Sequence, residues 1–165
     1  MGPIAAVLLV DSSIKWVTKA HVLGLTVDPK LRWDAHVMDV KKCFATKLDR
    51  LKRSKFLPKS VLRDFYFKVI LPSVKYGLVL WGVCCDSNLF DSIERLHFRA
   101  SRIIFNLPRA IPSKEVLAYD RWPTIFLYHK IDIFKIFLKA QNDGLPNLLS
   151  NNIYILGFHQ SCDQK

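Results

Sequence analysis

The sequence lacks the residue pairs on which common catalytic and metal sites depend. Its fourteen Asp and Glu residues are scattered, and the closest pair, Asp91 and Glu94, has helical spacing. There is no Asp-Asp pair, glycine-rich phosphate loop, HExxH motif or nucleophile elbow. Asp91 and Glu94 are interpreted as acids in the early turns of a helix, where they favour the helix dipole. No catalytic residue, metal ligand or cofactor is therefore expected.

Cysteines are few, and their spacing is not that of a disulfide framework. The four are Cys43, Cys84, Cys85 and Cys162, with no CxxC pair. This usage is typical of a reducing compartment and predicts a nuclear or cytoplasmic protein that is not secreted. The adjacent Cys84 and Cys85 are predicted to be two buried thiols rather than a metal site. His159 with Cys162 is one pair, too few for a four-ligand zinc site.

Long apolar runs are also missing. No stretch approaches ~18 uninterrupted apolar residues, because Pro72 and Lys75 interrupt the run at 69–85. The apolar run at 4–10 has no basic segment before it, which argues against a signal peptide. No membrane partner is expected.

Apolar residues are nevertheless abundant. The 165 residues fit one domain, or one domain with a short appendage, and 50% of them are hydrophobic and 12% aromatic. We interpret this as more apolar surface than a domain of this size can bury. A neighbouring domain or self-association is the expected use of the excess, with anchors at residues 76–81 and on the helix after Pro123.

The hydrophobic pattern predicts a mainly α fold, with a short N-terminal β hairpin followed by a bundle of five or six helices. Residues 14–17 and 21–27 are β-rich and predict the hairpin, with 18–20 between its strands. Residues 4–10 are a third strand or an apolar end. His36, close to a helix start, is expected to form a local hydrogen bond rather than to act in catalysis.

Helical periodicity begins at Asp34, the expected N-cap of the first helix. The apolar face of this helix is expected to contain Val37, Val40, Phe44, Leu48 and Leu51. A second helix is expected from an N-cap at Ser60 towards Leu71, where Pro72 ends or kinks it. Its apolar residues are Val61, Leu62, Phe65, Val69 and Ile70.

Three further segments complete the expected bundle. Residues 76–82 are nearly all apolar and should be buried. A helix is expected over 87–107, with an apolar face that contains Ile93, Leu96, Ala100, Ile103, Ile104 and Leu107. The last long helix should open at Pro123 and close at Gly144 and Pro146, with a thin polar stripe of His129, Asp132, Lys135 and Lys139.

Positive charge is concentrated in one part of the chain. Residues 30–75 have thirteen Lys and Arg residues against four Asp, a balance of +9 within a whole-chain charge of +11. Such a block predicts a polyanionic partner, and rows of Lys and Arg are typical of contacts with phosphate backbones. A solvated helix face or a helix lying on anionic lipid are the alternatives. The predicted nucleic-acid contacts are Lys41, Lys42, Lys52, Arg53, Lys55, Lys59, Arg95, Arg99 and Arg102.

The sequence also resembles a known family. The words VLGLTVDPKLRWDAHV, FLPKSVLRDFYFKVILPSVKYGLVLWG and IERLHFRASRIIFNLP occur in order at 22–37, 56–82 and 93–108. They resemble the region downstream of the catalytic palm in non-LTR, jockey-like retrotransposon reverse transcriptases. The similarity covers roughly residues 21–149.

The resemblance implies a part of a polymerase with no catalytic centre of its own. The hairpin with Leu23 and Gly24 would belong to a palm or primer-grip remnant at 1–30, followed by basic thumb-like helices at 31–82, post-thumb helices at 83–150 and a tail at 151–165. The family's Tyr/Phe-Ala-Asp-Asp motif is absent. We therefore expect a non-catalytic chain that binds the backbone of RNA, DNA or an RNA–DNA hybrid. The alternatives are a helical protein-interaction module and a non-functional relic that exposes apolar surface. The palm domain of such a polymerase is a further expected partner.

Overall fold

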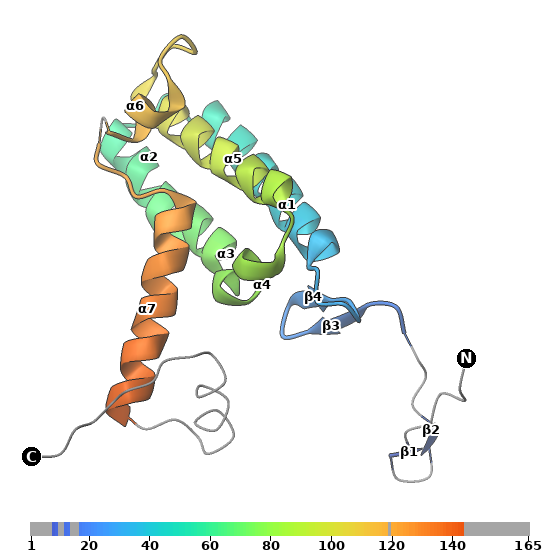
Figure 1. Cartoon of the computed structure of the whole chain (residues 1–165). Coiled ribbons are helices and arrows are strands. Elements are labelled where there is room, and N and C mark those ends of the chain that lie inside the picture. Colours follow the sequence, from blue (N-terminus) through green and yellow to red (C-terminus); the bar gives the residue numbers. More distant parts are fainter. Residues whose placement is uncertain (1–7, 10–11, 14–16, 119, 144–165) are drawn as a thin grey trace, which may run out of the picture.

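The computed structural model describes residues 8–9, 12–13, 17–118 and 120–143, and they form a mainly helical protein (Figure 1). This confirms the predicted fold class. The strands are β1 (Leu8–Leu9), β2 (Ser12–Ser13), β3 (Ala20–Val22) and β4 (Leu25–Val27). The helices are α1 (Asp34–Arg53), α2 (Lys59–Phe65), the π-helix η1 (Tyr66–Ile70), α3 (Leu71–Lys75), α4 (Leu78–Cys84), α5 (Ser87–Phe105), α6 (Ser113–Ala118) and α7 (Ile125–Asp143).

The hairpin forms later in the chain than predicted. β3 pairs antiparallel with β4, so both strands lie almost entirely inside the segment 21–27 that was expected to be one strand. The turn is Leu23-Gly24, with φ of 49° and 79°. Two consecutive positive φ angles are what a two-residue hairpin turn requires, and glycine adopts them without strain. Continuous β-forming residues on both sides conceal this turn in the sequence.

The other predicted strands are only partly described. β1 lies within the segment 4–10 and pairs with β2, a two-residue strand that was not predicted. Residues 14–16, expected to form the first hairpin strand, lie outside the described residues, as do most of 4–10.

Helix α1 has the predicted apolar face. Val37, Phe44, Leu48 and Leu51 are buried, and Val40 is half-buried against the same core. The predicted N-cap is wrong by one residue, because Asp34 is the first helical residue and Trp33 takes the cap position with a left-handed φ of 63°.

The second predicted helix starts earlier and runs further. Helix α2 follows Pro58, so Ser60 lies inside it and does not cap it. The helical path continues through η1 and past Pro72 to the end of α3. Proline lacks an amide hydrogen and clashes with the preceding turn, and the wider π turn directly before it accommodates this defect.

Burial in this region also departs from the expectation. Leu62 and Ile70 are buried, but Val61, Phe65 and Val69 are 46%, 45% and 48% exposed. Their place on the buried face is taken by Tyr66, which stacks on Trp122 at 5.0 Å between ring centroids. In the run 76–82 only Leu78 and Trp81 are fully buried, whereas Tyr76 and Leu80 are both 54% exposed.

Helix α5 lies alongside α1 and forms the centre of the bundle with it (Figure 1). It begins after Asp86, whose carboxylate accepts hydrogen bonds from the amides of Asn88 and Leu89 at 2.8 and 3.3 Å. It ends at a left-handed Asn106, a common helix terminator. Of its predicted face, Ile93, Ala100, Ile103 and Ile104 are buried.

Helix α7 starts two residues after Pro123, the predicted first residue. The Thr124 hydroxyl accepts from the amide of Leu127 at 3.0 Å and supplies the cap that proline cannot. The helix ends at Asp143, and the predicted terminators Gly144 and Pro146 lie outside the described residues. Among the described residues no single helix is long and apolar enough to cross a membrane; the bent pair Lys59–Lys75 and Leu78–Cys84 meets that test by length and composition alone.

The prediction of two buried thiols is wrong. Cys84 is exposed at the end of α4, and Cys85 is half-buried. Burial raises the pKa of the Cys85 thiol to about 11. Cys43 on α1 is also exposed, and Cys162 lies outside the described residues, as does His159.

Candidate nucleic-acid interface

The outer surface of α1 displays four of the predicted contact residues. Lys41, Lys42, Lys52 and Arg53 are all exposed, and none forms an ion pair within the described part of the chain. Eleven residues separate Lys41 from Lys52, and Lys42 from Arg53, so each pair repeats after three helical turns, about 17 Å along the axis. We call these four residues the α1 cations. They form two rows of free positive charge.

The basic surface continues beyond the end of α1. Lys55 and Lys59 are exposed in the loop after α1 and at the first position of α2. The Lys55 ammonium donates to the side-chain oxygen of Asn106 at 3.3 Å. Since Asn106 terminates α5, this bond brings the α1–α2 loop beside the end of α5.

The three predicted arginines of α5 have unequal surroundings. Arg95 is exposed, and among the described residues its side chain bonds only to the carbonyl oxygen of Asp91 on its own helix, at 3.3 Å. Arg99 forms a 2.7 Å ion pair with Asp49 of α1. Arg102 is half-buried and donates to the carbonyl oxygen of Ile111 at 2.9 Å.

Arg102 thus holds the loop before α6. Its guanidinium also reaches the Ser113 hydroxyl at 3.4 Å, at the first position of α6. Its Nε atom is buried and has no partner among the described residues. Arg95 and Arg99 lie closer to solvent. The three arginines therefore share one helical spacing but differ in how accessible their guanidinium groups are to a nucleic acid.

Glu94, the acid that precedes Arg95 on α5, has a structural contact. Glu94 accepts from the amide of Ile125 at 2.9 Å and so anchors the first turn of α7. Burial raises the pKa of Glu94 to about 6, against the opposing effect of these amide hydrogen bonds. No group of three His, Cys, Asp or Glu residues in the described segments is arranged to hold a metal ion.

The hairpin is fixed to the helices through its tip. Leu23 is 85% exposed, but its carbonyl oxygen accepts a 2.6 Å hydrogen bond from the Tyr76 hydroxyl. The Tyr76 ring also lies 3.7 Å from where a side-chain carbon at Gly24 would be. The predicted primer-grip-like residues are therefore held beside the junction of α3 and α4.

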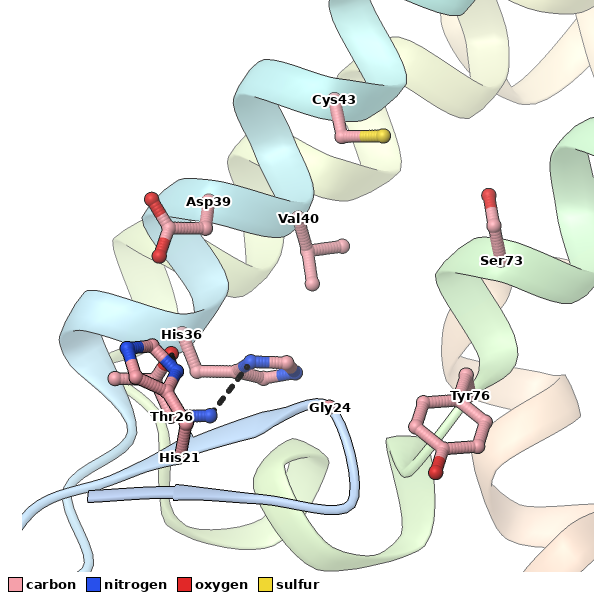
Figure 2. Close-up of a pocket in the computed structure, with 9 residues that line it drawn as sticks. All are labelled: His21, Gly24, Thr26, His36, Asp39, Val40, Cys43, Ser73 and Tyr76. Carbon is pink, nitrogen blue, oxygen red and sulfur yellow. Dashed lines mark hydrogen bonds between the residues drawn. The ribbon is translucent and has the colours of Figure 1, made fainter.

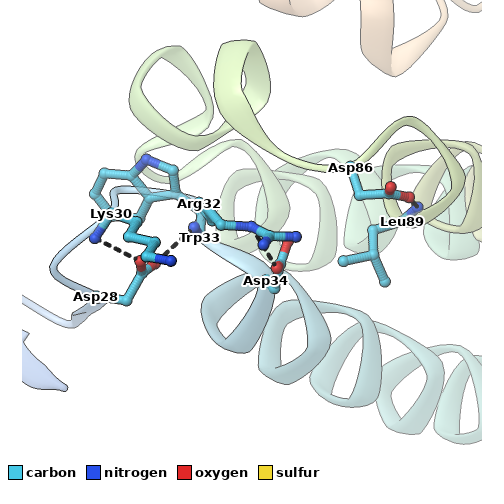
Figure 3. A network of polar contacts seen from close by, with 7 residues as sticks. All are labelled: Asp28, Lys30, Arg32, Trp33, Asp34, Asp86 and Leu89. Carbon is cyan, nitrogen blue, oxygen red and sulfur yellow. Dashed lines mark hydrogen bonds and ion pairs between the residues drawn. The ribbon is translucent and has the colours of Figure 1, made fainter. Parts of the chain in front are cut away.

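A network of polar contacts orients the hairpin on the start of α1 (Figure 3). The Asp28 carboxylate accepts 2.9 Å hydrogen bonds from the amides of Lys30 and Trp33. The bond from Trp33 is the main cause that lowers the pKa of Asp28 below its ordinary value. An exposed ion pair of 3.3 Å between Arg32 and Asp34 follows directly. The connection between β4 and α1 is thus a fixed turn.

His36 joins the same two elements. Its Nδ1 atom accepts a long hydrogen bond, 3.4 Å, from the amide of Thr26 in β4. Its ring packs edge-on against Trp33 and Trp81, and burial lowers its pKa. The expected local hydrogen bond at the helix start is therefore replaced by a bond to the hairpin.

A pocket of about 330 Å³ opens between the hairpin, α1 and α3 (Figure 2). Its polar lining includes His21, His36, Asp39, Cys43, Ser73 and Tyr76. At one end the Lys47 ammonium donates to the Ser73 hydroxyl at 2.7 Å, which links α1 to α3. No sequence signal indicated this pocket, because its walls come from segments up to about fifty residues apart.

Three curated proteins of Drosophila melanogaster are similar to about half of the chain. A probable RNA-directed DNA polymerase from transposon X-element is 29% identical over 90 residues, 52% of this chain and 10% of that protein. The RNA-directed DNA polymerase from mobile element jockey is 26% identical over 99 residues, 57% of this chain and 11% of that protein. A probable RNA-directed DNA polymerase from transposon BS is 26% identical over 95 residues.

These similarities confirm the predicted resemblance to polymerases of non-LTR retrotransposons. The matched region spans about a tenth of the length of the relatives. No family model matches the chain, and no solved structure matches it.

Proposed function

We propose that this chain, similar as it is to RNA-directed DNA polymerases of non-LTR retrotransposons, is a non-catalytic part of such a polymerase that holds RNA or an RNA–DNA duplex by its phosphate backbone. The supporting observation is that the α1 cations are exposed and form no ion pair with any described residue. Backbone binding of this kind needs free cations at regular spacing and no base-specific contacts.

The proposed division of labour follows the predicted segments. Residues 1–30 would be a remnant of the palm and primer grip, 31–82 thumb-like helices on the duplex, 83–150 a post-thumb region and 151–165 a tail. The α1 cations, Lys55 and Lys59 would bind phosphates, and Arg95 and Arg99 would extend the surface along α5. A palm domain would be a natural neighbour, in the nucleus or the cytoplasm.

Absence of catalysis is part of the proposal. Glu94 is occupied by the amide of Ile125, and the other acids of the sequence stand apart from one another. A polymerase needs paired carboxylates that hold divalent metal ions. A primer-extension assay with Mg²⁺ or Mn²⁺ should therefore show no nucleotide addition by the purified chain, and reproducible addition would refute this part of the proposal.

The binding experiment is a titration of a fluorescent RNA–DNA hybrid with the purified chain. The variant Lys41/Lys42/Lys52/Arg53→Glu should lose most of the affinity, because four positive charges become negative and the net charge of the proposed surface falls by eight units. The matched control is Lys68/Lys130/Lys135/Lys139→Glu, which makes the same charge change on exposed residues of other elements. Equal loss in both variants would show that only net charge matters, and would contradict a localised interface.

The apolar surface of α7 favours a second candidate, a helical interaction module. Leu127, Ile131, Phe134 and Leu138 are 45%, 37%, 58% and 40% exposed. They recur at i, i+4, i+7 and i+11, the spacing of a seam between paired helices. This candidate predicts self-association at micromolar concentration. Sedimentation should show it abolished by Phe134→Asp and unchanged by Lys41/Lys42→Glu; a monomeric wild-type chain would exclude it.

A further inference from the structure

We propose that the pocket between the hairpin, α1 and α3 binds one unpaired nucleobase of the nucleic acid that the α1 cations hold. This inference rests on the proposed function and adds a preference to it, namely for strands with a base that is free of pairing. Proteins that bind single strands combine a basic surface that follows the backbone with aromatic side chains on which the unpaired bases stack.

The size and walls of the pocket suit a flat polar ligand. Its volume of about 330 Å³ is at the small end of ligand sites in proteins. Tyr76 is 54% exposed, and its hydroxyl is held by the carbonyl oxygen of Leu23, so the ring cannot turn freely. A fixed, accessible aromatic ring is a stacking platform for a base.

His36 supplies a hydrogen-bond donor that has no partner. Its Nδ1 atom accepts from the Thr26 amide, so the proton of the neutral imidazole is on Nε2. Nε2 is buried, with the residue only 6% exposed, and has no hydrogen-bond partner among the described residues. Figure 2 shows the ring extending from α1 towards Gly24 and Tyr76. A buried donor without an acceptor costs free energy, and a ligand acceptor placed there would recover it.

The pocket lining also includes one carboxylate acceptor. Asp39 lines the pocket and is exposed, and it forms no ion pair within the segments described. Cys43, one helical turn after Asp39, is a further polar group on this wall. The pocket thus offers a donor at His36 and a carboxylate acceptor at Asp39. The hydrogen-bonding edge of a nucleobase has both complementary functions, ring or carbonyl acceptors and amino or imino donors.

The pocket also lies where a bound strand would pass. Lys41 and Lys42 lie between Asp39 and Cys43 in the sequence of α1. The phosphate-binding and pocket-lining residues therefore lie within two turns of one helix. A strand held at Lys42 can therefore present an adjacent unpaired base to the pocket, and a fully paired duplex cannot. Paired and unpaired probes distinguish this inference from backbone binding alone.

The chain has a built-in reporter for the test. Cys43 lines the pocket and Cys84 does not, and both thiols are exposed. Alkylation by N-ethylmaleimide, with peptide mapping by mass spectrometry, would measure each thiol in the same sample. The probes are a blunt RNA–DNA hybrid and the same hybrid with a short single-stranded RNA extension. Each is used at a concentration that saturates the chain.

The extended hybrid should slow alkylation of Cys43 at least fivefold more than the blunt hybrid does, with Cys84 unaffected by either. Equal protection of Cys43 by both probes would overturn the base pocket and leave backbone binding intact. If neither probe binds at all, the proposed function fails, and the base pocket fails with it.

A pair of variants gives an independent measurement. Cys43→Trp fills the pocket without changing charge, and Cys84→Trp makes the same change at the exposed thiol of α4. Cys43→Trp should reduce affinity for the extended hybrid by about tenfold, the value of one stacked base, and leave affinity for the blunt hybrid unchanged. Cys84→Trp should change neither. An unchanged ratio of the two affinities in Cys43→Trp would contradict the inference, and circular dichroism verifies that both variants are folded.

Discussion

The long helices α1 and α5 lie side by side and both have rows of basic residues, but these residues have different surroundings on the two helices. On α1 the four cations point into solvent and have no ion pairs among the described residues. On α5, Glu94 bonds to the first residue of α7 and His97 bonds to the loop before α7. Arg102 bonds to the loop before α6 and to the first residue of α6. The comparison shows that a basic stripe in a sequence has two possible uses, binding a partner or holding neighbouring segments. The burial of each basic residue and its hydrogen-bond partners in the structure show which of the two uses applies.

The largest expected effect is on α1. Replacing Lys41, Lys42, Lys52 and Arg53 by Ala should weaken hybrid binding by roughly three orders of magnitude at low salt, at about 1 kcal/mol for each cation near an anionic surface. The free energy of unfolding should change little, because exposed side chains without partners contribute little to stability. Fluorescence anisotropy and urea denaturation measure the two quantities. A large loss of stability with intact binding would show that the α1 cations stabilise the fold and do not bind the hybrid.

The second largest effect is on the stability of the fold. It depends on pH and comes from His97 on α5. His97 is fully buried between Tyr66, whose hydroxyl bonds to its Nδ1, and the carbonyl oxygen of Pro123, which accepts from Nε2 at 2.9 Å. Burial lowers the pKa of His97 to about 4 from 6.5, and the bond to Pro123 opposes this only in part. The unfolded chain therefore binds more protons between these values, so stability falls as pH falls from 6.5 to 4.

This loss should amount to about 3 kcal/mol, from a shift of two to three pKa units at ~1.4 kcal/mol each. Urea denaturation at a series of pH values measures it. The variant His97→Gln should be less stable at pH 7.5 and should lose less stability on acidification than the wild type. Parallel pH curves for the two chains would show that His97 titrates like an exposed histidine.

Replacing Arg102 should have the third largest effect, a loss of unfolding free energy. Arg102→Ala removes the donors to Ile111 and Ser113 and leaves their half-buried acceptors unpaired, which should cost about 1–3 kcal/mol of unfolding free energy. Its hybrid binding, measured where the variant is folded, should remain near that of the wild type. A variant of full stability with weakened binding would show that Arg102 contacts the hybrid.

Arg99 should have the smallest effect on stability. Its ion pair with Asp49 is 2.7 Å long, but both side chains are about half exposed, at 43% and 51%. Exposed ion pairs contribute roughly 0.2–1 kcal/mol. Arg99→Ala, compared with Asp49→Ala and the double variant, measures the coupling. A coupling above about 2 kcal/mol would place Arg99 with the structural residues of α5.

The sequence was sufficient for features that depend on local pattern. The face of α1 from Val37 to Leu51 was predictable because its period is fixed by helix geometry. The exposure of the α1 cations followed from the same period. The resemblance to non-LTR polymerases was also visible in the sequence, and the similarity to the X-element and jockey proteins agrees with it.

Features that depend on distant contacts were not predictable. The turn at Leu23-Gly24 was missed because the segments on either side of it are equally β-forming. Arg102 looked equivalent to Arg99 by spacing, and only the loop that folds back before α6 makes it structural. The pocket requires Tyr76 to meet the hairpin tip, a contact across more than fifty residues. Tertiary packing determines each of these.

The salt dependence of hybrid binding, measured from ~50 to 300 mM, should distinguish the wild-type chain from the α1 alanine variant. Each phosphate contact contributes about 0.7–0.9 to the slope of log affinity against log salt. If the α1 cations bind phosphates, the variant's slope should be shallower than that of the wild type by about three units. An equal slope in the two chains would show that α1 does not contact the backbone, and would contradict the account.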